Sequence, residues 1–504
     1  MAGRVIHNRQ ERTAAGAMVL GGSRVVTRLL DLVTLLILAR FLLQEDFGLV
    51  ATALIFVQIA EAVFDVPVVN LLLRLKSVSR RHLDNYFTLA LLRGALIAAI
   101  MGALAWPISL FYGDDRLVAL VCVLSIAPGI RGLRSPRQVL TARRLNYLPD
   151  AVAEAIGKLV ALIVAASIAI STGSYWAIAA GTISTPVVSA MVSFAILPFF
   201  PRLDLSHWPL FRNFLGWSMG SQTLSALNWQ TDRMVLAKVV TLSQLGLFTV
   251  ARDLATNTIS SVVTVMLAPV TSALSGVSGD KPRMADAYMR AIAAVISICA
   301  PLVVGQALLA DAFVPLLLGA QWTDAVPVFQ LISLSLLLTL YAYPANALFY
   351  AAGRPNLVFT RQLLDLLFRV PVTIALSLLY GIMGAAVALL AAEALLVVIC
   401  TVSVQRLTGI TVWRQLGSGV RPLVSCAIMA AGVLLVRQYA PPPVDPAGQA
   451  LVLLMTVPLG AILYVGAHYL LWRWAGRPRG IEEMASAMVE RRFAVLRGGR
   501  IRTG

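Results

Sequence analysis

Residues 17–41 read AMVLGGSRVVTRLLDLVTLLILARF, an apolar run interrupted by Arg24, Arg28 and Asp31. A bilayer core is about 30 Å thick and needs about 20 such residues in one helix. The rest of the 504-residue chain has the same character, with 59% apolar and 13% charged residues. A soluble fold cannot bury that much apolar surface, because burial is limited by the ratio of surface to volume. The composition also excludes a disordered chain and a disulfide scaffold, so we expect an all-α integral membrane protein.

Further apolar runs of similar length follow the first one. Runs bounded by charges, Pro or Gly predict about fourteen transmembrane helices in all. The predicted spans are 17–41, 48–72, 84–106, 116–136, 149–171, 175–198, 213–238, 246–273, 287–310, 324–350, 357–380, 382–405, 419–437 and 449–472. The two spans within 357–405 are divided only at Tyr380 and Gly381.

The basic residues predict the topology of these spans. With both termini in the cytoplasm, most of the 41 Lys and Arg residues fall in inner segments, and the outer loops hold only Arg116 and Arg437. Cytoplasmic loops of membrane proteins carry such an excess of positive charge. The net charge of +17 therefore faces anionic lipid rather than nucleic acid. We expect no secretory signal peptide, because the first apolar run contains arginines and no small-residue cleavage site.

An internal repeat relates the two halves of the chain. The end of the first span reads LARF at 38–41 and FGL at 47–49, and the end of the seventh reads LAKV at 236–239 and LGL at 245–247, a constant offset of 198 residues. We therefore predict a six-helix lobe at 1–200, a second six-helix lobe at 201–410, two additional helices at 411–475 and a basic cytoplasmic tail at 476–504. Parallel repeats of this kind are typical of alternating-access carriers, with the substrate path between them.

Charged residues within spans are candidate functional groups, because a charge in the bilayer core is costly. Arg24, Arg28 and Asp31 share one face of the first span. Two cations four residues apart repel each other unless an anion lies between them. One interpretation is an anion site that contains Arg28. The other is a pair between Arg28 and Asp31, with Arg24 extended to the membrane interface.

The seventh span carries a long polar stripe. Its members at helical spacing are Ser218, Ser221, Gln222, Ser225, Asn228, Trp229, Asp232 and Arg233. Ser and Asn side chains also form hydrogen bonds between packed helices. A stripe of this length favours the wall of a water-filled cavity.

Other intramembrane charges allow more than one interpretation. Arg252 stands beside Asp253 in the eighth span, either as a local ion pair or as a ligand group. Glu61 and Asp65 could share a proton, bind a cation or neutralise an arginine of the first span. The acid and base four residues apart in Glu154 and Lys158, and again in Asp365 and Arg369, predict salt bridges within their helices. Arg93 and Glu393 have no obvious partner in the sequence.

No pattern in the sequence predicts an enzyme, a metal site or a cofactor. The four cysteines stand singly within apolar runs, and the histidines form no ligand or catalytic pattern. These residues are Cys122, Cys299, Cys400, Cys426, His7, His82, His207 and His468. A membrane glycan polymerase or ligase would need a large outer loop or a catalytic cluster, and the predicted outer loops are short.

Four stretches carry a resemblance to a known family: LARFLLQEDFGLVA at 38–51, ARRLN at 142–146, the DR…LG element at 232–249 and AGRPN at 352–356. They resemble the polysaccharide-transport (Wzx-type) oligosaccharide flippases of the multidrug/oligosaccharidyl-lipid/polysaccharide superfamily. The resemblance implies two six-helix lobes in a V. It also implies export of undecaprenyl-diphosphate-linked glycans across the bacterial inner membrane for O-antigen, capsule or exopolysaccharide synthesis. The implied partners are a polysaccharide polymerase and a chain-length regulator.

Similarity to the related lipid II flippase implies a cationic cavity with basic residues in spans one, two and eight. Arg24, Arg28 and Arg252 match in spans one and eight, whereas span two offers Glu61 and Asp65 instead. We therefore expect a diphosphate site of Arg24, Arg28, Arg252 and Arg233, with the polar stripe facing the glycan. The main alternative is a cation-coupled multidrug antiporter of the same superfamily. Its candidate coupling acids are Asp31, Glu61, Asp65 and Asp232.

Overall fold

The computed structural model describes residues 2–65, 69, 72–73, 75–206, 208–277, 279–439 and 445–477. Within these ranges, the side chains of 2–18, 20, 208–219, 221, 268, 269, 272 and 275 are not described. Some sequence predictions therefore lie wholly or partly outside the described residues, among them the end of the span 48–72, the side chains of Ser218 and Ser221, and most of the tail 476–504.

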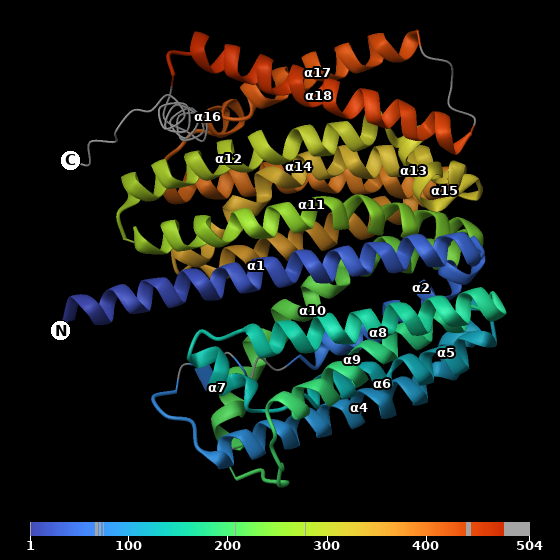
Figure 1. Ribbon diagram of the computed structural model, residues 1–504, viewed down its shortest axis with the longest axis vertical. Helices are drawn as coiled ribbons and strands as arrows, with labels where there is room; N and C mark the ends of the chain where they lie inside the picture. The colour runs from blue at the N-terminus through green and yellow to red at the C-terminus, as the bar shows by residue number, and fades with distance from the viewer. Residues whose placement is uncertain are drawn as a thin grey trace, which may run out of the picture. The chain divides into compact units, whose positions relative to one another are not determined.

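Every element in the described part of the chain is a helix (Figure 1). The predicted all-α class is confirmed. The helices are α1 (Ala2–Phe41), α2 (Gln44–Val63), α4 (Arg80–Tyr112), α5 (Arg116–Leu124), α6 (Ile126–Gly132), α7 (Gln138–Arg143), α8 (Leu148–Thr172), α9 (Trp176–Ile196), α10 (Trp208–Val239), α11 (Leu242–Gly276), α12 (Lys281–Leu308), α13 (Ala310–Leu318), the 3-10 helix η1 (Ala320–Ala325), α14 (Val326–Ala351), α15 (Pro355–Thr408), α16 (Val412–Gly417), α17 (Val420–Gln438) and α18 (Pro446–Trp474).

Nine helical segments among the described residues are long and apolar enough to cross a bilayer. One of them, α15, contains 54 residues and bends at Gly381, whose φ of 58° and ψ of −135° are not helical. Glycine adopts a positive φ without steric cost. The predicted division between 357–380 and 382–405 is therefore confirmed. Helices α1, α10 and α11, with 40, 32 and 35 residues, are also long enough to span a bilayer. The total of fourteen spans stays a prediction.

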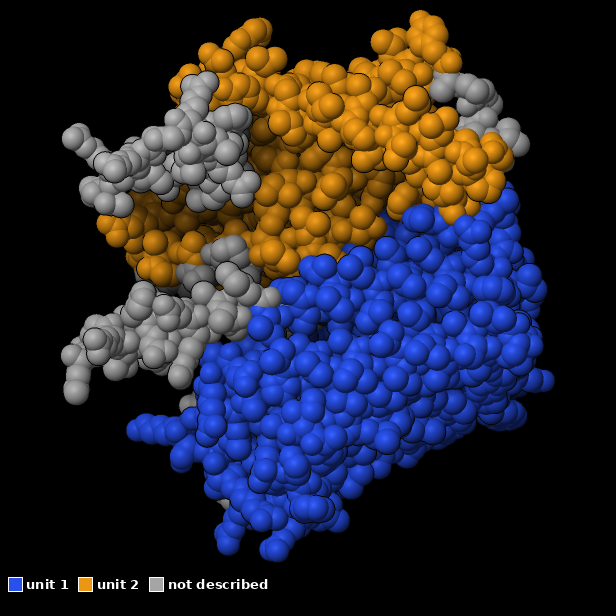
Figure 2. Space-filling model, in the orientation of Figure 1, with its two compact units in different colours: residues 1–257, 317–328, 362–389 blue, residues 258–316, 329–361, 390–504 orange. Residues whose placement is uncertain are grey.

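The chain forms two compact units (Figure 2). Unit 1 consists of Met1–Asn257, Leu317–Val328 and Gln362–Leu389, and unit 2 consists of Thr258–Leu316, Phe329–Arg361 and Leu390–Gly504. Each unit combines segments that are distant in the sequence. The division into repeats at about residues 200 and 410 stays a prediction.

Unit 1 contains most of the residues singled out in the sequence. Helix α4 packs against α5 and α6, while α8 packs against both α9 and α1. A core of buried apolar side chains, including Leu49, Ile97, Met101 and Leu120, joins α2, α4 and α5. Within a bilayer such side chains hold the helices together by van der Waals packing, because lipid is as apolar as they are.

Unit 2 is built around α12. Its residues Tyr288, Ile292 and Val295 are fully buried in a core shared with α14 and α17. Helices α17 and α18 pack together, and the hydroxyl of Tyr464 on α18 donates to the carbonyl of Ser297 on α12 at 2.6 Å. Elsewhere α18 exposes large apolar side chains such as Leu454, as expected of a helix that faces lipid.

Two glycines join the repeated motifs directly within unit 1. A Cβ built on Gly48 of α2 would come within 1.9 Å of the carbonyl oxygen of Leu242, and one built on Gly246 of α11 would come within 1.9 Å of that of Gln44. Gln44 and Leu242, like Gly48 and Gly246, are related by the offset of 198 residues found in the sequence. The two motifs therefore contact each other reciprocally, backbone against backbone.

Candidate functional site

The first group of predicted site residues lies on α1 and its neighbours. We call Arg24, Arg28, Asp31, Lys158 and Asn257 the α1 cluster. The carboxylate of Asp31 accepts from Nζ of Lys158 on α8 at 2.5 Å, whereas Nη1 of Arg28 lies 4.0 Å from it. Arg28 Nη1 instead donates to Oδ1 of Asn257 on α11 at 3.2 Å. Arg24 is exposed and makes no ion pair with the part of the chain that the structure describes.

The contacts of Lys158 correct one sequence prediction. The spacing of Glu154 and Lys158 predicted a salt bridge within α8, but Glu154 pairs with Arg134 and Lys158 pairs with Asp31. Both partners come from neighbouring segments, because packing places them closer than the next helical turn. The prediction for Asp365 and Arg369 is confirmed, at 3.4 Å.

A second group surrounds the end of α2. We call Glu61, Asp65, Arg93, Arg131 and Gln222 the α2 cluster. Glu61 accepts from Nη1 of Arg131 at 2.6 Å and 2.8 Å, and Asp65 pairs with Arg93 at 3.3 Å. Gln222 on α10 donates to the second Asp65 oxygen at 3.2 Å. The two acids therefore neutralise arginines of α4 and α6 rather than those of α1.

A third group is largely buried where α10, α11 and α15 meet in unit 1. This α10 cluster contains Asp232, Arg233, Arg252, Asp253, Asp365 and Arg369. Asp232 is fully buried and accepts from Nη1 of Arg252 at 2.7 Å. Nη1 of Arg369 lies 3.7 Å from the same carboxylate, and Arg233 pairs with Asp253.

The burial of Arg252 corrects the expected diphosphate site. Only 3% of this residue is exposed, and its guanidinium is engaged with Asp232 and lies over the ring of Trp229 at 4.7 Å. Arg233 is also buried and paired. In this conformation neither guanidinium is open to a ligand, because each already forms an ion pair with a carboxylate. Arg28 has only a long ion pair with Asp31, at 4.0 Å, and with 49% of its side chain exposed it can still reach a ligand.

The polar stripe of α10 is divided between two environments. Gln222 is exposed and Ser225 is half-buried, whereas Asn228 is buried and donates to the carbonyl of Gln362 at 2.8 Å. Trp229 is about half exposed. Asn228 therefore holds two helices together, whereas Gln222, Ser225 and Trp229 keep part of their surface open to a polar ligand.

The three clusters differ in charge. The α2 cluster balances two arginines with two carboxylates, and the α10 cluster balances three with three. The α1 cluster has three cations and one carboxylate. It is therefore the group whose positive charge is not neutralised within the cluster, which suits it to an anion.

Sequence reasoning did not identify Asn257 or the role of Lys158. Asn257 stands in the polar run TNTISS at 256–261, directly after the pair Arg252 and Asp253, and that run was a usable signal. Arg28 thus reaches the eighth predicted span, as the phosphate hypothesis expected, but through Asn257 rather than through Arg252.

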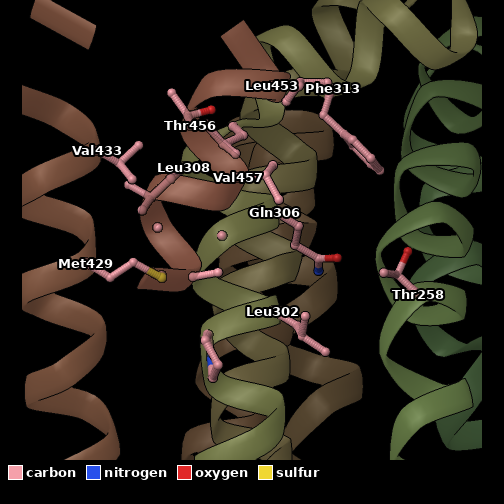
Figure 3. Close-up of a pocket in the computed structure, with 15 residues that line it drawn as sticks. Thr258, Leu302, Gln306, Leu308, Phe313, Met429, Val433, Leu453, Thr456 and Val457 are labelled. Atoms are coloured by element: carbon pink, nitrogen blue, oxygen red, sulfur yellow. The ribbon is translucent and has the colours of Figure 1, made fainter. Parts of the chain in front are cut away.

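Unit 2 contains a pocket of a different kind, with a volume of about 260 Å³ (Figure 3). Gln306 and Thr456 supply polar atoms, while apolar side chains such as Leu302, Phe313 and Met429 supply most of the lining. None of the described residues that line it is charged. This pocket suits a hydrocarbon group and not a diphosphate.

Among the described residues, no three His, Cys, Asp or Glu side chains are grouped closely enough to hold a metal ion. The four cysteines are free thiols.

Comparison with known proteins gives matches in sequence. The family described as "Polysaccharide biosynthesis protein" matches residues 37–327. The succinoglycan biosynthesis transport protein ExoT of Rhizobium meliloti is 24% identical over 308 residues, 61% of this chain and 62% of that protein. The match to ExoT thus spans less than two thirds of its length. The lipopolysaccharide biosynthesis protein WzxC of Escherichia coli is 22% identical over 386 residues, 74% of this chain and 77% of that protein.

Solved structures give matches in fold. The lipid II flippase MurJ, in an inward closed conformation, superposes with a TM-score of 0.69 over 92% of this chain and 100% of that chain, at 15% identity. An inward-facing multidrug resistance MATE family transporter of the MOP superfamily superposes with a TM-score of 0.59, at 15% identity, over 78% of this chain and 99% of that chain. At such identities the likeness shows a shared fold.

Proposed function

This chain belongs to the polysaccharide biosynthesis protein family that its residues 37–327 match, and on that premise we propose that it is a flippase for polyprenyl-diphosphate-linked oligosaccharides. The resemblance noted in the sequence is confirmed by that match and by the likeness to WzxC. The chain is a multi-pass membrane protein with the fold shared by MurJ and the MATE transporter. The proposed activity is transport and not catalysis.

The uncompensated positive charge of the α1 cluster is the observation that supports this function. A diphosphate cannot enter hydrocarbon without a counter-charge. A guanidinium recognises phosphate oxygens with two parallel hydrogen bonds. Arg28 is half exposed, with Asp31 held by Lys158 at 2.5 Å. Arg28 and Arg24 would therefore hold the diphosphate, while Gln222 and Ser225 offer hydrogen bonds to sugars.

The mechanism that we propose is alternating access. The head group binds while the cavity is open to the cytoplasm, and it is released on the opposite side after the two lobes rock. The setting is the bacterial inner membrane, with both termini in the cytoplasm, as the distribution of Lys and Arg predicts. The product would pass to a polysaccharide polymerase and a chain-length regulator.

The ion pairs favour this function over a cation-coupled multidrug antiporter. A carboxylate that a basic side chain already neutralises binds a proton or a metal cation less readily than an unpaired one. Each of the four candidate acids holds a basic side chain, since Asp31 pairs with Lys158, Glu61 with Arg131, Asp65 with Arg93 and Asp232 with Arg252.

Replacing Arg28 with Ala tests the proposed function. A hydrogen bond to a charged group contributes about 1.5–3 kcal/mol, so we expect transport to fall about tenfold to a hundredfold. Arg28→Lys should retain part of the activity, because an ammonium keeps the charge but not the planar fork. The measurement is the flipping rate of an undecaprenyl-diphosphate-linked oligosaccharide in proteoliposomes.

The matched control is Arg290→Ala. Arg290 is exposed at the start of α12, where it pairs with Asp286 within the same helix. Its replacement should leave the flipping rate within about twofold of wild type, because an exposed pair contributes little. Wild-type transport by Arg28→Ala would contradict a phosphate contact at this residue.

The apolar pocket of unit 2 suits the hydrocarbon part of such a lipid. Gly305 lines it, and a Cβ on this residue would meet nothing within 4 Å. We expect Gly305→Phe to fill the pocket and to slow the flipping of the long-chain lipid. A short-chain diphosphate analogue should be flipped at an unchanged rate. The control is Gly466→Phe on α18, which is exposed and does not line the pocket. Equal slowing of both lipids would exclude a role for this pocket in chain binding.

A further inference from the structure

Asp31 has two basic neighbours and is held by one of them. Both of its carboxylate oxygens lie 2.5 Å from Nζ of Lys158, whereas Nη1 of Arg28 lies 4.0 Å from Oδ2. Arg28 and Asp31 are three residues apart on α1, so their pairing needs no movement of the helix. The pair with Arg28 is thus at the outer limit of an ion pair, while the close contact comes from Lys158 on α8, which packs against α1.

The two cations also differ in exposure. The side chain of Lys158 is 19% exposed, and that of Arg28 is 49% exposed. Lys158 is thus turned toward the helix interface, where it satisfies Asp31. The guanidinium of Arg28 has one neutral acceptor, Oδ1 of Asn257, and most of its donors remain open.

We propose that Lys158 is a positioning residue that keeps Arg28 available to the diphosphate by holding Asp31 away from it. Asp31 is then an internal competitor of the ligand. When Lys158 holds it, Arg28 binds a phosphate oxygen. When a rearrangement of α8 against α1 withdraws Lys158, Asp31 pairs with Arg28 and displaces the phosphate. This inference rests on the proposed function, because it requires a diphosphate at Arg28.

Two other roles of Lys158 would look similar in a single variant. Lys158 could contact the diphosphate itself, or the pair with Asp31 could serve only to hold α1 against α8. A double-mutant cycle over Asp31 and Lys158 separates the three roles, since it measures whether one side chain acts through the other.

The experiment measures the affinity of the purified full chain for undecaprenyl diphosphate in mild detergent, with Lys158→Met, Asp31→Asn, the double variant and Arg28→Ala. We expect Lys158→Met to weaken binding about fivefold, because the released Asp31 then pairs with Arg28. In the Asp31→Asn background, the same replacement should change the affinity by less than about twofold. Asp31→Asn alone should bind at least as tightly as wild type.

Thermal unfolding of the same variants distinguishes positioning from a structural role. Asp31→Asn leaves Lys158 without its carboxylate, so the melting temperature should fall although the affinity does not. A purely structural pair would make affinity and melting temperature fall together in both single variants. That outcome overturns the proposal, and it can be read from Asp31→Asn even if Lys158→Met fails to fold.

The remaining outcomes also distinguish between the three roles of Lys158. Equal losses of affinity from Lys158→Met in both backgrounds would show a direct contact and overturn the proposal. No loss in either background overturns it as well. In these cases the proposed function still stands if Arg28→Ala loses affinity. If Arg28→Ala binds undecaprenyl diphosphate as tightly as wild type does, both the phosphate site at Arg28 and the proposed role of Lys158 are excluded.

Discussion

Replacing Asp232 with Ala is expected to lower the free energy of unfolding by about 3–5 kcal/mol, the cost of leaving a buried charge without its partner. Asp232 is fully buried and is shared by Arg252 at 2.7 Å and Arg369 at 3.7 Å. Its loss would remove the carboxylate that pairs with Arg252 and would leave Arg369 paired with Asp365. The effect can be measured by denaturant titration of the detergent-solubilised protein.

Two further variants show whether the lost charge causes the lower stability expected of Asp232→Ala. Asp232→Asn keeps the shape and the chance of a hydrogen bond from Thr373, but it should lose nearly as much stability as Asp232→Ala. Asp286→Ala breaks an exposed pair with Arg290 and should cost less than about 1 kcal/mol. A stable Asp232→Asn protein would show that the α10 cluster is held by packing and not by charge.

Replacing Gly246 with Ala is expected to cost about 1–3 kcal/mol, because overpacking forces the backbone to shift. The added Cβ would lie 1.9 Å from the carbonyl oxygen of Gln44 and 2.8 Å from its carbon, and neither atom belongs to a flexible side chain. Gly48→Ala meets the carbonyl of Leu242 in the same way. The melting temperature of each variant is the measurement.

The control is Gly102→Ala on α4, where an added Cβ would meet nothing within 4 Å. This variant should be neutral or more stable by about 0.5–1 kcal/mol, because Ala favours a helix over Gly. The double variant of Gly48 and Gly246 should cost less than the sum of the single variants, since both strain one crossing. Full additivity would mean that the two contacts are independent.

Local sequence signals predicted much of the fold. The composition was sufficient to predict an all-helical membrane protein, and the glycine after Tyr380 was sufficient to predict the break within α15. The offset of 198 residues found a repeat whose two copies contact each other at equivalent positions. These features depend on hydropathy and backbone conformation, which are properties of short segments.

The sequence was a poorer guide to which charges meet. Spacing within α8 favoured a pair between Glu154 and Lys158, but helix packing gave each a partner elsewhere. Arg28 and Arg252 look alike as intramembrane arginines, yet one is half exposed and the other is buried against Asp232. Burial and partner choice depend on tertiary packing, and a single sequence does not contain that information.

The reciprocal contact of Gly48 and Gly246 has a consequence for how such a chain can change over time. Main-chain atoms meet on both sides, so the junction requires only that one position in each copy carry no side chain. The two motifs are then free to differ at the positions around these glycines. Each can carry its own chemistry, such as arginines on α1 and a neutral ion-pair network on α10 and α11, while the backbone contact between them is kept.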